Sequence, residues 1–180
     1  MKKTVLTFGL ISGAITGGMM LLGLPLADSP NFKQAEIIGY TTIVLSSLIV
    51  FFGVRSYRDN VASGRLSFGR GLAVGILITL ISSAIYVGTW ELIYYKLRPD
   101  FGEKFAAHMV EQAKASGASP QKIEERVRQA QQFKQMYDKP AVNVAYTFIE
   151  VFPFGLVVTL ISAAVLRNKD ASAATLAANG

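Results

Sequence analysis

Two glutamates that stand alone in apolar stretches are the residues of this chain best suited to chemistry. Glu91 is the one formal charge in residues 71–95, and Glu150 is the one formal charge in residues 141–166. Both stretches are long enough to cross a bilayer as helices, at about 1.5 Å per residue. A carboxyl group inside the hydrocarbon is costly, and such a residue is by default a hypothesis of function. These acids predict a site for a proton or a cation.

The two acids are expected at different depths. Glu91 lies four residues from the outer end of its helix, roughly 6 Å down, whereas Glu150 lies nine residues beyond Ala141, roughly 14 Å down and near the midplane. Asn143 and Thr147 precede Glu150 on the same helix face and extend a polar line toward the outer surface. The candidate proton or cation site is therefore Glu150, Glu91, Asn143 and Thr147. The alternative is a protonated Glu150 that hydrogen-bonds to a neighbouring helix and serves packing alone.

The elements that must hold these acids are four apolar segments, expected at residues 4–27, 37–54, 71–95 and 141–166. With 51% hydrophobic and 17% charged residues and a mean hydropathy of +0.37, the chain is too apolar for an ordinary soluble domain of its length. The first segment exceeds the apolar core of a signal peptide, about 7 to 15 residues, which favours an uncleaved helix. We expect an all-α integral membrane protein: a bundle of four transmembrane helices in one domain, 1–170, with a disordered tail, 171–180.

Basic residues between the segments set the expected orientation. Lys2 and Lys3 precede the first segment, one lysine follows it, four arginines lie in residues 55–70, and Arg167 and Lys169 close the last segment. Because short basic loops stay in the cytoplasm, this alternation places both termini and the arginine loop there. Topology accounts for the net charge of +6, so no nucleic-acid partner is expected.

Residues 96–140 form a polar insert with nine basic and six acidic side chains. Apolar residues recur in it at spacings of three and four, which predicts two amphipathic helices. Gly117 fits a helix stop, and Ser119 followed by Pro120 is typical of an N-cap and a first helical residue. We expect a helical hairpin over about 99–139, outside the membrane between the third and fourth spans.

Small residues mark the expected contacts between helices, because in lipid they let backbones approach closely. The predicted packing residues are Gly9, Gly13, Gly17, Gly75, Thr79, Ser82, Gly155, Thr159 and Ser162. Residues 75–84 also resemble residues 155–164, for which we favour a shared packing stripe over an inverted repeat. The third segment has a second small face with Ala73, Ala84 and Gly88, so we expect neighbours on both of its sides and place it at the centre of the bundle.

The remaining candidates offer little catalysis. Trp90, Tyr94 and Tyr95 sit near the outer end of the third segment, where aromatic rings favour the interface, and are expected to be anchors. With no cysteine and one histidine, His108, the chain offers no metal-ligand set. No nucleophile elbow, zinc motif or nucleotide-binding loop is present, so we expect no enzyme, no catalytic residue and no cofactor.

The chain nevertheless resembles a known family over nearly its whole length. The matching residues are Ser67-Phe68-Gly69, Gly75, Ile85-Tyr86, Trp90-Glu91, Tyr94-Tyr95, Pro99-Asp100-Phe101, Phe133-Lys134-Gln135-Met136-Tyr137, Pro140, Thr147-Phe148-Ile149-Glu150, Pro153, Gly155 and Leu160-Ile161-Ser162. They are similar to those of the bacterial membrane family DUF4199, a domain of unknown function. Members typically carry a phenylalanine-lysine pair after the Ser-Phe-Gly element, where this chain has residues 70–73, Arg-Gly-Leu-Ala. The resemblance implies a small multi-pass protein of the bacterial inner (cytoplasmic) membrane, without an assigned activity.

Two functions follow from these features. The leading one is a non-enzymatic membrane protein that, besides the lipid bilayer, contacts a second copy of itself or a membrane partner through its hairpin and small-residue faces. The alternative is a small proton- or cation-coupled transporter that uses the intramembrane glutamates.

Overall fold

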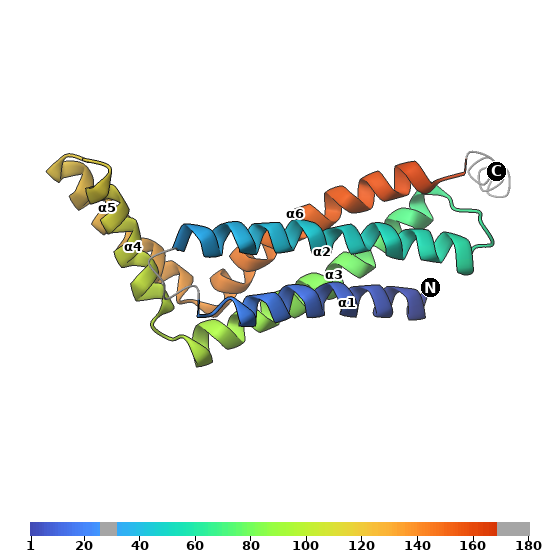
Figure 1. Cartoon of the computed structure of the whole chain (residues 1–180), viewed down its shortest axis with the longest axis horizontal. Coiled ribbons are helices and arrows are strands. Elements are labelled where there is room, and N and C mark those ends of the chain that lie inside the picture. Colours follow the sequence, from blue (N-terminus) through green and yellow to red (C-terminus); the bar gives the residue numbers. More distant parts are fainter. Residues whose placement is uncertain (26–31, 169–180) are drawn as a thin grey trace. The chain divides into compact units, whose positions relative to one another are not determined.

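The computed structural model describes residues 1–25 and 32–168, and this part of the chain is all-helical (Figure 1). It contains six α-helices and no strand: α1 Lys2–Leu22, α2 Phe32–Asn60, α3 Phe68–Leu92, α4 Phe101–Ala115, α5 Pro120–Tyr137 and α6 Pro140–Leu166. A π-helical turn, η2 Ile93–Leu97, continues α3. The predicted disordered tail, 171–180, lies outside the described residues.

Four of the helices are long and apolar enough to cross a membrane, which confirms the predicted all-helical class with four long apolar helices. They are Lys2–Leu22, Glu36–Asn60, Phe68–Leu97 and Pro140–Leu166, with mean hydropathies of 1.8 to 2.2 over their most apolar windows. The second helix continues to Asn60, well past the expected end at residue 54. Arg55 and Asp59 lie one turn apart in this extension and form an ion pair of 3.6 Å, a spacing that supports helix.

The chain folds into two compact units. Of the described residues, the first comprises 1–25, 32–89 and 148–168, and the second comprises 90–147. The first unit therefore contains α1, α2, most of α3 and most of α6. The second contains the end of α3, η2, α4, α5 and the first turns of α6.

In the first unit, three glycines spaced one turn apart let α1 lie directly on α3. A Cβ atom added at Gly9 would lie 2.8 Å from Ile81 Cβ. At Gly13 it would lie 2.5 Å from Ile85 Cδ1, and at Gly17 it would lie 2.8 Å from Thr89 Oγ1. Ser12, on the same face, reaches Ser82 Oγ at 3.2 Å and donates to the carbonyl of Ser46 on α2 at 3.0 Å. Figure 1 shows α1 running alongside α2.

The contact between α3 and α6 is reciprocal. A Cβ at Gly75 would lie 2.5 Å from Thr159 Cγ2, and a Cβ at Gly155 would come into the same kind of contact with Thr79 Cγ2. The two threonine hydroxyls face each other at 3.3 Å. Because each glycine meets the threonine of the other helix, the two helices cross antiparallel. The similarity between residues 75–84 and 155–164 thus corresponds to one helix crossing, the packing stripe that the sequence favours.

The expectation of neighbours on both small faces of α3 is wrong within the described chain. Gly71, Gly75 and Thr79 contact α6, while Ser82 and Thr89 contact α1. The other small face, with Ala73, Ala84 and Gly88, is exposed, and a Cβ added at Gly88 meets nothing within 4 Å. The physical reason is that α1, α2 and α6 all pack around the opposite side of α3.

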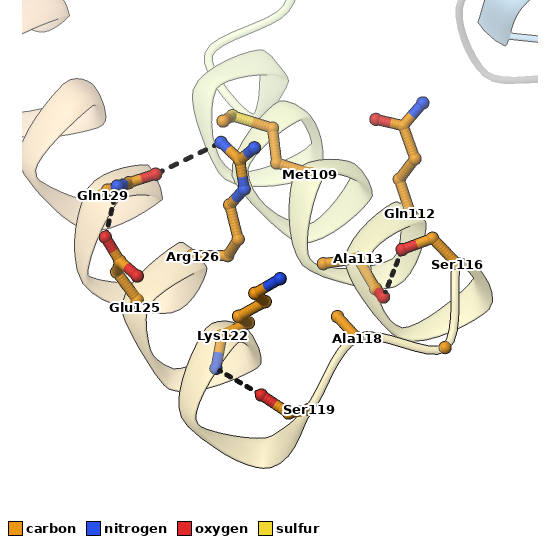
Figure 2. Close-up of a pocket in the computed structure, with 11 residues that line it drawn as sticks. Met109, Gln112, Ala113, Ser116, Ala118, Ser119, Lys122, Glu125, Arg126 and Gln129 are labelled. Atoms are coloured by element: carbon orange, nitrogen blue, oxygen red, sulfur yellow. Dashed lines mark hydrogen bonds between the residues drawn. The ribbon is translucent and has the colours of Figure 1, made fainter.

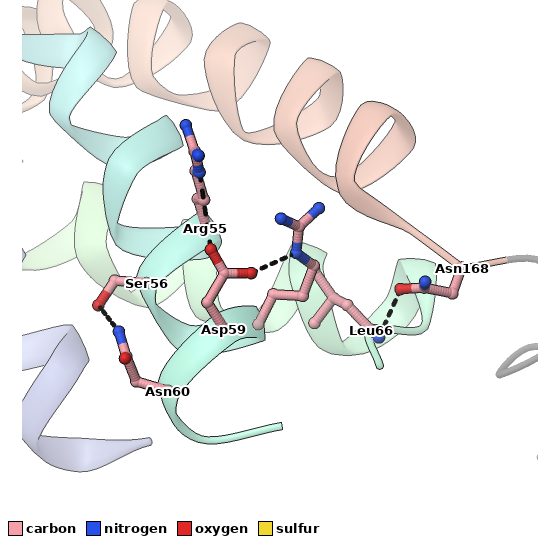
Figure 3. A network of polar contacts seen from close by, with 7 residues as sticks. Arg55, Ser56, Asp59, Asn60, Leu66 and Asn168 are labelled. Carbon is pink, nitrogen blue, oxygen red and sulfur yellow. Dashed lines mark hydrogen bonds and ion pairs between the residues drawn. The ribbon is translucent and has the colours of Figure 1, made fainter. Parts of the chain in front are cut away.

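One end of this unit is closed by Leu66, which is fully buried in the hydrophobic core with Val54, Val74 and Leu166. Its backbone N–H donates to Asn168 Oδ1 at 3.2 Å, and its carbonyl accepts from the Asn168 N–H at 2.9 Å (Figure 3). Asn168 therefore ties the segment that follows α6 to the loop between α2 and α3.

In the second unit, α4 and α5 pack against each other through aromatic rings. Phe105 of α4 and Phe133 of α5 have ring centroids 6.0 Å apart. The turn between the helices contains Gly117 at φ 72°, a left-handed conformation that favours glycine. The predicted N-cap at Ser119 is confirmed, since its side chain accepts from the Lys122 N–H at 3.4 Å and Pro120 is the first helical residue.

Candidate functional site

The four residues of the predicted proton or cation site are divided between the two units. Glu150 belongs to the first unit, whereas Glu91, Asn143 and Thr147 belong to the second. The polar surroundings of Glu150 are therefore described separately from those of Glu91, Asn143 and Thr147.

Glu150 of α6 faces Tyr40 of α2. The Tyr40 hydroxyl lies within hydrogen-bonding reach of the Glu150 carboxyl group. Tyr40 is 43% exposed, while Glu150 is half-buried. Pro153 lies in the same helix one turn later, where it cannot donate to the backbone ladder. This arrangement pairs the one acid of α6 with a phenol, which can donate a hydrogen bond to a carboxylate.

Glu91 lies at the end of α3, just before the π-helical turn η2. Its Oε1 atom is buried and has no hydrogen-bond partner among the described residues. A π-helical turn is rare and is frequently found at functional sites. The Arg98 N–H closes this turn by donating to the Ile93 carbonyl at 2.7 Å.

Asn143 and Thr147 form a short hydrogen-bonded chain with Tyr137. Both side chains are buried, Asn143 at 0% and Thr147 at 2% exposure. The Thr147 hydroxyl donates to Asn143 Oδ1 at 3.3 Å and lies 3.3 Å from the Tyr137 hydroxyl. The Nδ2 atom of Asn143 is buried without a hydrogen-bond partner in the described chain. Such a donor is unusual in a folded protein and requires an explanation.

Tyr95 lies four positions after Glu91 in the sequence. Its hydroxyl donates to the backbone carbonyl of Asp138 at 3.1 Å, which ties η2 to the segment that leads into α6.

Asp138 accepts hydrogen bonds from two side chains of this unit. The Tyr94 hydroxyl donates to its Oδ1 atom at 2.5 Å, and Lys134 Nζ donates to its Oδ2 atom at 3.0 Å. These bonds, first the one from Tyr94 and then the one from Lys134, hold the pKa of Asp138 below its ordinary value. The same carboxylate raises the pKa of Lys134.

The predicted interface anchors lie around an aromatic cluster. Tyr94 is only 5% exposed, and its ring lies 5.4 Å from that of Tyr137. The Trp90 ring lies 5.0 Å from that of Phe101, and its indole N–H is buried without a partner in the described residues. Tyr95 packs on Tyr94 at 5.0 Å between ring centroids.

A pocket of about 840 Å³ lies between α4 and α5 near their connecting turn (Figure 2). Its lining includes Lys122, Glu125, Arg126 and Gln129 of α5. Arg126 donates to Gln129 at 3.2 Å, and Gln129 donates to Glu125 at 3.2 Å, so these side chains satisfy one another across the surface of α5. The pocket is open, and its charged lining residues, Lys122, Glu125 and Arg126, are all exposed.

Sequence reasoning missed Tyr40 and the role of Asp138. Tyr40 stands in an apolar segment without any spacing that links it to Glu150, because the two residues belong to different helices. Asp138 looks like one of many surface charges in the polar insert. Only tertiary packing pairs it with Tyr94, 44 positions away.

The described residues contain no group of three or more histidine, cysteine, aspartate or glutamate side chains that could hold a metal ion. The fold and these sites define a class: an all-helical protein with four long apolar helices and isolated acids within two of them. The model of the family of proteins of unknown function, DUF4199, matches residues 7–168, and the chain belongs to that family. No curated protein and no solved structure matches the chain.

Proposed function

We propose that this chain is a non-enzymatic, multi-pass protein of a bacterial inner membrane that assembles with a second copy of itself or with a membrane partner. The four long apolar helices support insertion in a bilayer. The basic residues at both chain ends and in residues 55–70 support cytoplasmic termini. In this orientation α4 and α5 form a helical hairpin on the outer side.

The observation that carries the assembly proposal is the unused small-residue face of α3. Ala73, Leu77, Leu80, Ala84 and Gly88 are all exposed and fall on one side of the helix. Ala84 and Gly88 have the spacing of small residues at which helix backbones approach each other in lipid. The adjacent leucines supply the dispersion contacts that such an interface needs.

Single cysteines test this face directly, because the natural chain has none. Ala84→Cys and Gly88→Cys would be oxidised in isolated membranes, and the products separated by non-reducing electrophoresis. We expect both variants to form a disulfide-linked dimer or a specific larger adduct with a membrane partner. Leu80→Cys should also form a crosslinked product, because Leu80 lies one turn before Ala84 on the same face of α3.

A matched control is Gly39→Cys, on α2, where an added Cβ meets nothing within 4 Å. It is exposed in the same way but lies away from the α3 face, so it should remain uncrosslinked. If all four positions gave equal adducts, or if none did, the α3 face would not be an interface and the assembly proposal would be refuted.

The polar pocket of the hairpin offers a second contact surface. Helix α4 buries none of its residues, and α5 buries only Ala130, so both helices keep most of their surface available. Two basic side chains, Lys122 and Arg126, against one acidic side chain, Glu125, leave the lining with a small positive excess that suits an acidic group of a partner.

The second candidate function is a small proton- or cation-coupled transporter. It is favoured by the contact between Glu150 and Tyr40, because an acid within a long apolar helix is by default a functional site. Proteoliposomes loaded with a pH-sensitive dye test it. A proton or cation flux that disappears in Glu150→Gln is the required result, and equal flux in both proteins would exclude this candidate.

A further inference from the structure

In the first unit, one end of each of the four long helices meets the others at a common core (Figure 1). This core surrounds the fully buried Leu66 and contains residues of all four helices, among them Val5, Val54, Val74 and Leu166. Helices α1 and α3 begin at this end of the unit, while α2 and α6 finish at it. Segments that lie far apart in the sequence therefore share one surface.

All of the net positive charge of the chain belongs to this surface, which is formed by residues 1–5, 55–70 and 166–168 and which we call the basic end. Its basic side chains are two lysines at the start of α1, four arginines in residues 55–70, and Arg167, and its one acid is Asp59. The whole chain has 18 basic and 12 acidic residues, so the remaining 11 of each kind balance. The basic end alone thus accounts for the net charge of +6.

Only part of this charge is neutralised within the described chain. Asp59 pairs with Arg55 at 3.6 Å and with Arg58 at 2.7 Å (Figure 3). The other five basic side chains of the basic end are exposed and form no ion pair with an acid of the described residues. Exposed cations gathered on one surface, with one acid among them, attract anionic groups of a partner.

Two of the unpaired arginines are held side by side by backbone contacts. Arg65 and Arg167 each precede one member of the hydrogen-bonded pair formed by Leu66 and Asn168. The two bonds of that pair measure 3.2 and 2.9 Å (Figure 3). The chain segments that carry the two guanidinium groups therefore lie next to each other, although they are about a hundred positions apart in the sequence.

Exposed apolar side chains occur in the same segment as these arginines. Phe68, the first residue of α3, is 36% exposed, and Val61 is 48% exposed. Arg65 and Arg70 flank Phe68 in the sequence. A soluble anion needs the basic groups alone, whereas a membrane lipid also covers apolar side chains with its acyl chains. The combination of cations and exposed apolar groups fits a phospholipid better than an acidic protein segment.

We propose that the basic end binds the headgroup of an anionic phospholipid, and that Arg65 and Arg167 hold its phosphate. A guanidinium group binds phosphate oxygens through two parallel hydrogen bonds. Clusters of basic residues beside the end of a membrane-spanning helix are typical of sites for anionic lipids. The inference rests on the proposed insertion of the four long helices in a bilayer, and it depends on neither self-assembly nor transport.

Thermal unfolding of the full-length protein in a mild detergent tests this site. The protein would be compared with phosphatidylglycerol, with phosphatidylcholine of the same acyl chains, and with soluble polyglutamate. Because a ligand that binds only the folded state stabilises it by mass action, phosphatidylglycerol at ten times its dissociation constant should raise Tm by about 4 °C over phosphatidylcholine. The difference should nearly vanish in about 1 M NaCl, where the screening length falls to about 3 Å.

Two double variants locate the lipid. Arg65→Gln with Arg167→Gln should raise the phosphatidylglycerol concentration needed for half of the effect about thirtyfold, because each basic residue near anionic lipid contributes about a factor of five. Lys114→Gln with Arg128→Gln is the matched control. It removes two positive charges from exposed positions of the second unit, outside the basic end, and should keep the full response.

Three results would overturn the proposal. The first is an equal Tm of the wild-type protein in the two lipids, and the second is an equal loss of response in the two double variants. The third is a rise of Tm with polyglutamate and none with phosphatidylglycerol, which would identify an acidic protein segment as the ligand.

Flotation distinguishes failure of this site from failure of the proposed membrane insertion. The wild-type protein would be reconstituted in phosphatidylcholine vesicles, washed with alkaline carbonate and floated on a density gradient. Protein that floats but shows no lipid preference keeps the membrane insertion and loses the lipid site alone. Protein that does not float refutes the insertion, and this inference fails with it.

Discussion

Replacing Gly75 at the α3–α6 crossing by alanine should destabilise the protein, because the added methyl group would clash with Thr159. In Gly75→Ala the new methyl group would lie 2.5 Å from Thr159 Cγ2 and 2.8 Å from Thr159 Oγ1. Carbon atoms in contact are normally about 3.5 to 4.0 Å apart, so the helices must move apart or the threonine must leave its rotamer. Overpacking of this kind costs about 2 kcal/mol. For a chain of this size, that cost corresponds to a Tm about 6 °C lower.

The assay is thermal unfolding in detergent, followed by the loss of helical circular dichroism. A second change should restore most of the stability: Thr159→Ala removes the two nearest atoms and leaves only Thr159 Cβ, 3.0 Å from the new methyl group. The double variant should therefore be more stable than the sum of the two single changes by about 1 kcal/mol or more. The mirrored pair, Gly155→Ala with Thr79→Ala, should behave in the same way, because the contact is reciprocal.

Gly88→Ala is the matched control on the same helix, since a Cβ there meets nothing within 4 Å. It should raise stability by about 0.5 to 1 kcal/mol, because alanine loses less backbone entropy in a helix than glycine does. If Gly75→Ala and Gly88→Ala unfolded at the same temperature, or if Thr159→Ala failed to rescue Gly75→Ala, the close approach of α3 and α6 would be refuted.

Three further predictions concern individual hydrogen bonds. Tyr40→Phe and Glu150→Gln should be non-additive in unfolding free energy, because each removes one half of the same contact; additive effects would show that the two side chains do not interact. Asp138→Asn should lower Tm at neutral pH, and its difference from the wild-type protein should shrink as the pH falls below 3.8. The reason is that a carboxyl with a lowered pKa stabilises the folded state only while it is ionised, so a difference independent of pH would contradict the cause given for Asp138. Asn168→Ala should cost about 1 kcal/mol by removing the acceptor of the Leu66 N–H, and Asn168→Asp, which keeps an acceptor, should retain most of the stability.

The predictions that the structure confirms depend on interactions between residues close in the sequence. Four apolar runs of sufficient length become four long helices, because a helix satisfies all of its backbone groups within the segment. The N-cap at Ser119 and the proline after it follow from side-chain chemistry within one turn. The end of α2 was placed too early because Arg55 and Asp59 look like a polar loop until their spacing of four residues is used in a helix.

The candidate site shows where local reasoning stops. Helical periodicity places Asn143 and Thr147 on one face, and the structure gives them a common hydrogen bond. The same periodicity extends that line to Glu150, whereas the structure gives Glu150 a partner on α2. Depth along a helix is a property of one segment, but the choice of partner depends on which helix lies alongside.

The all-helical class, the number of long helices and most of the small residues at which those helices meet follow from the sequence. Composition, helix length and glycine spacing are sufficient for those, since they depend on neighbours within a few turns. Packing between helices sets which small face of α3 is used and that Gly75 meets Thr159 while Gly155 meets Thr79. It also gives Asp138 two hydrogen-bond donors, while Glu91 Oε1 has none among the described residues. These outcomes depend on contacts between residues that are dozens of positions apart, and no spacing within a single segment encodes them.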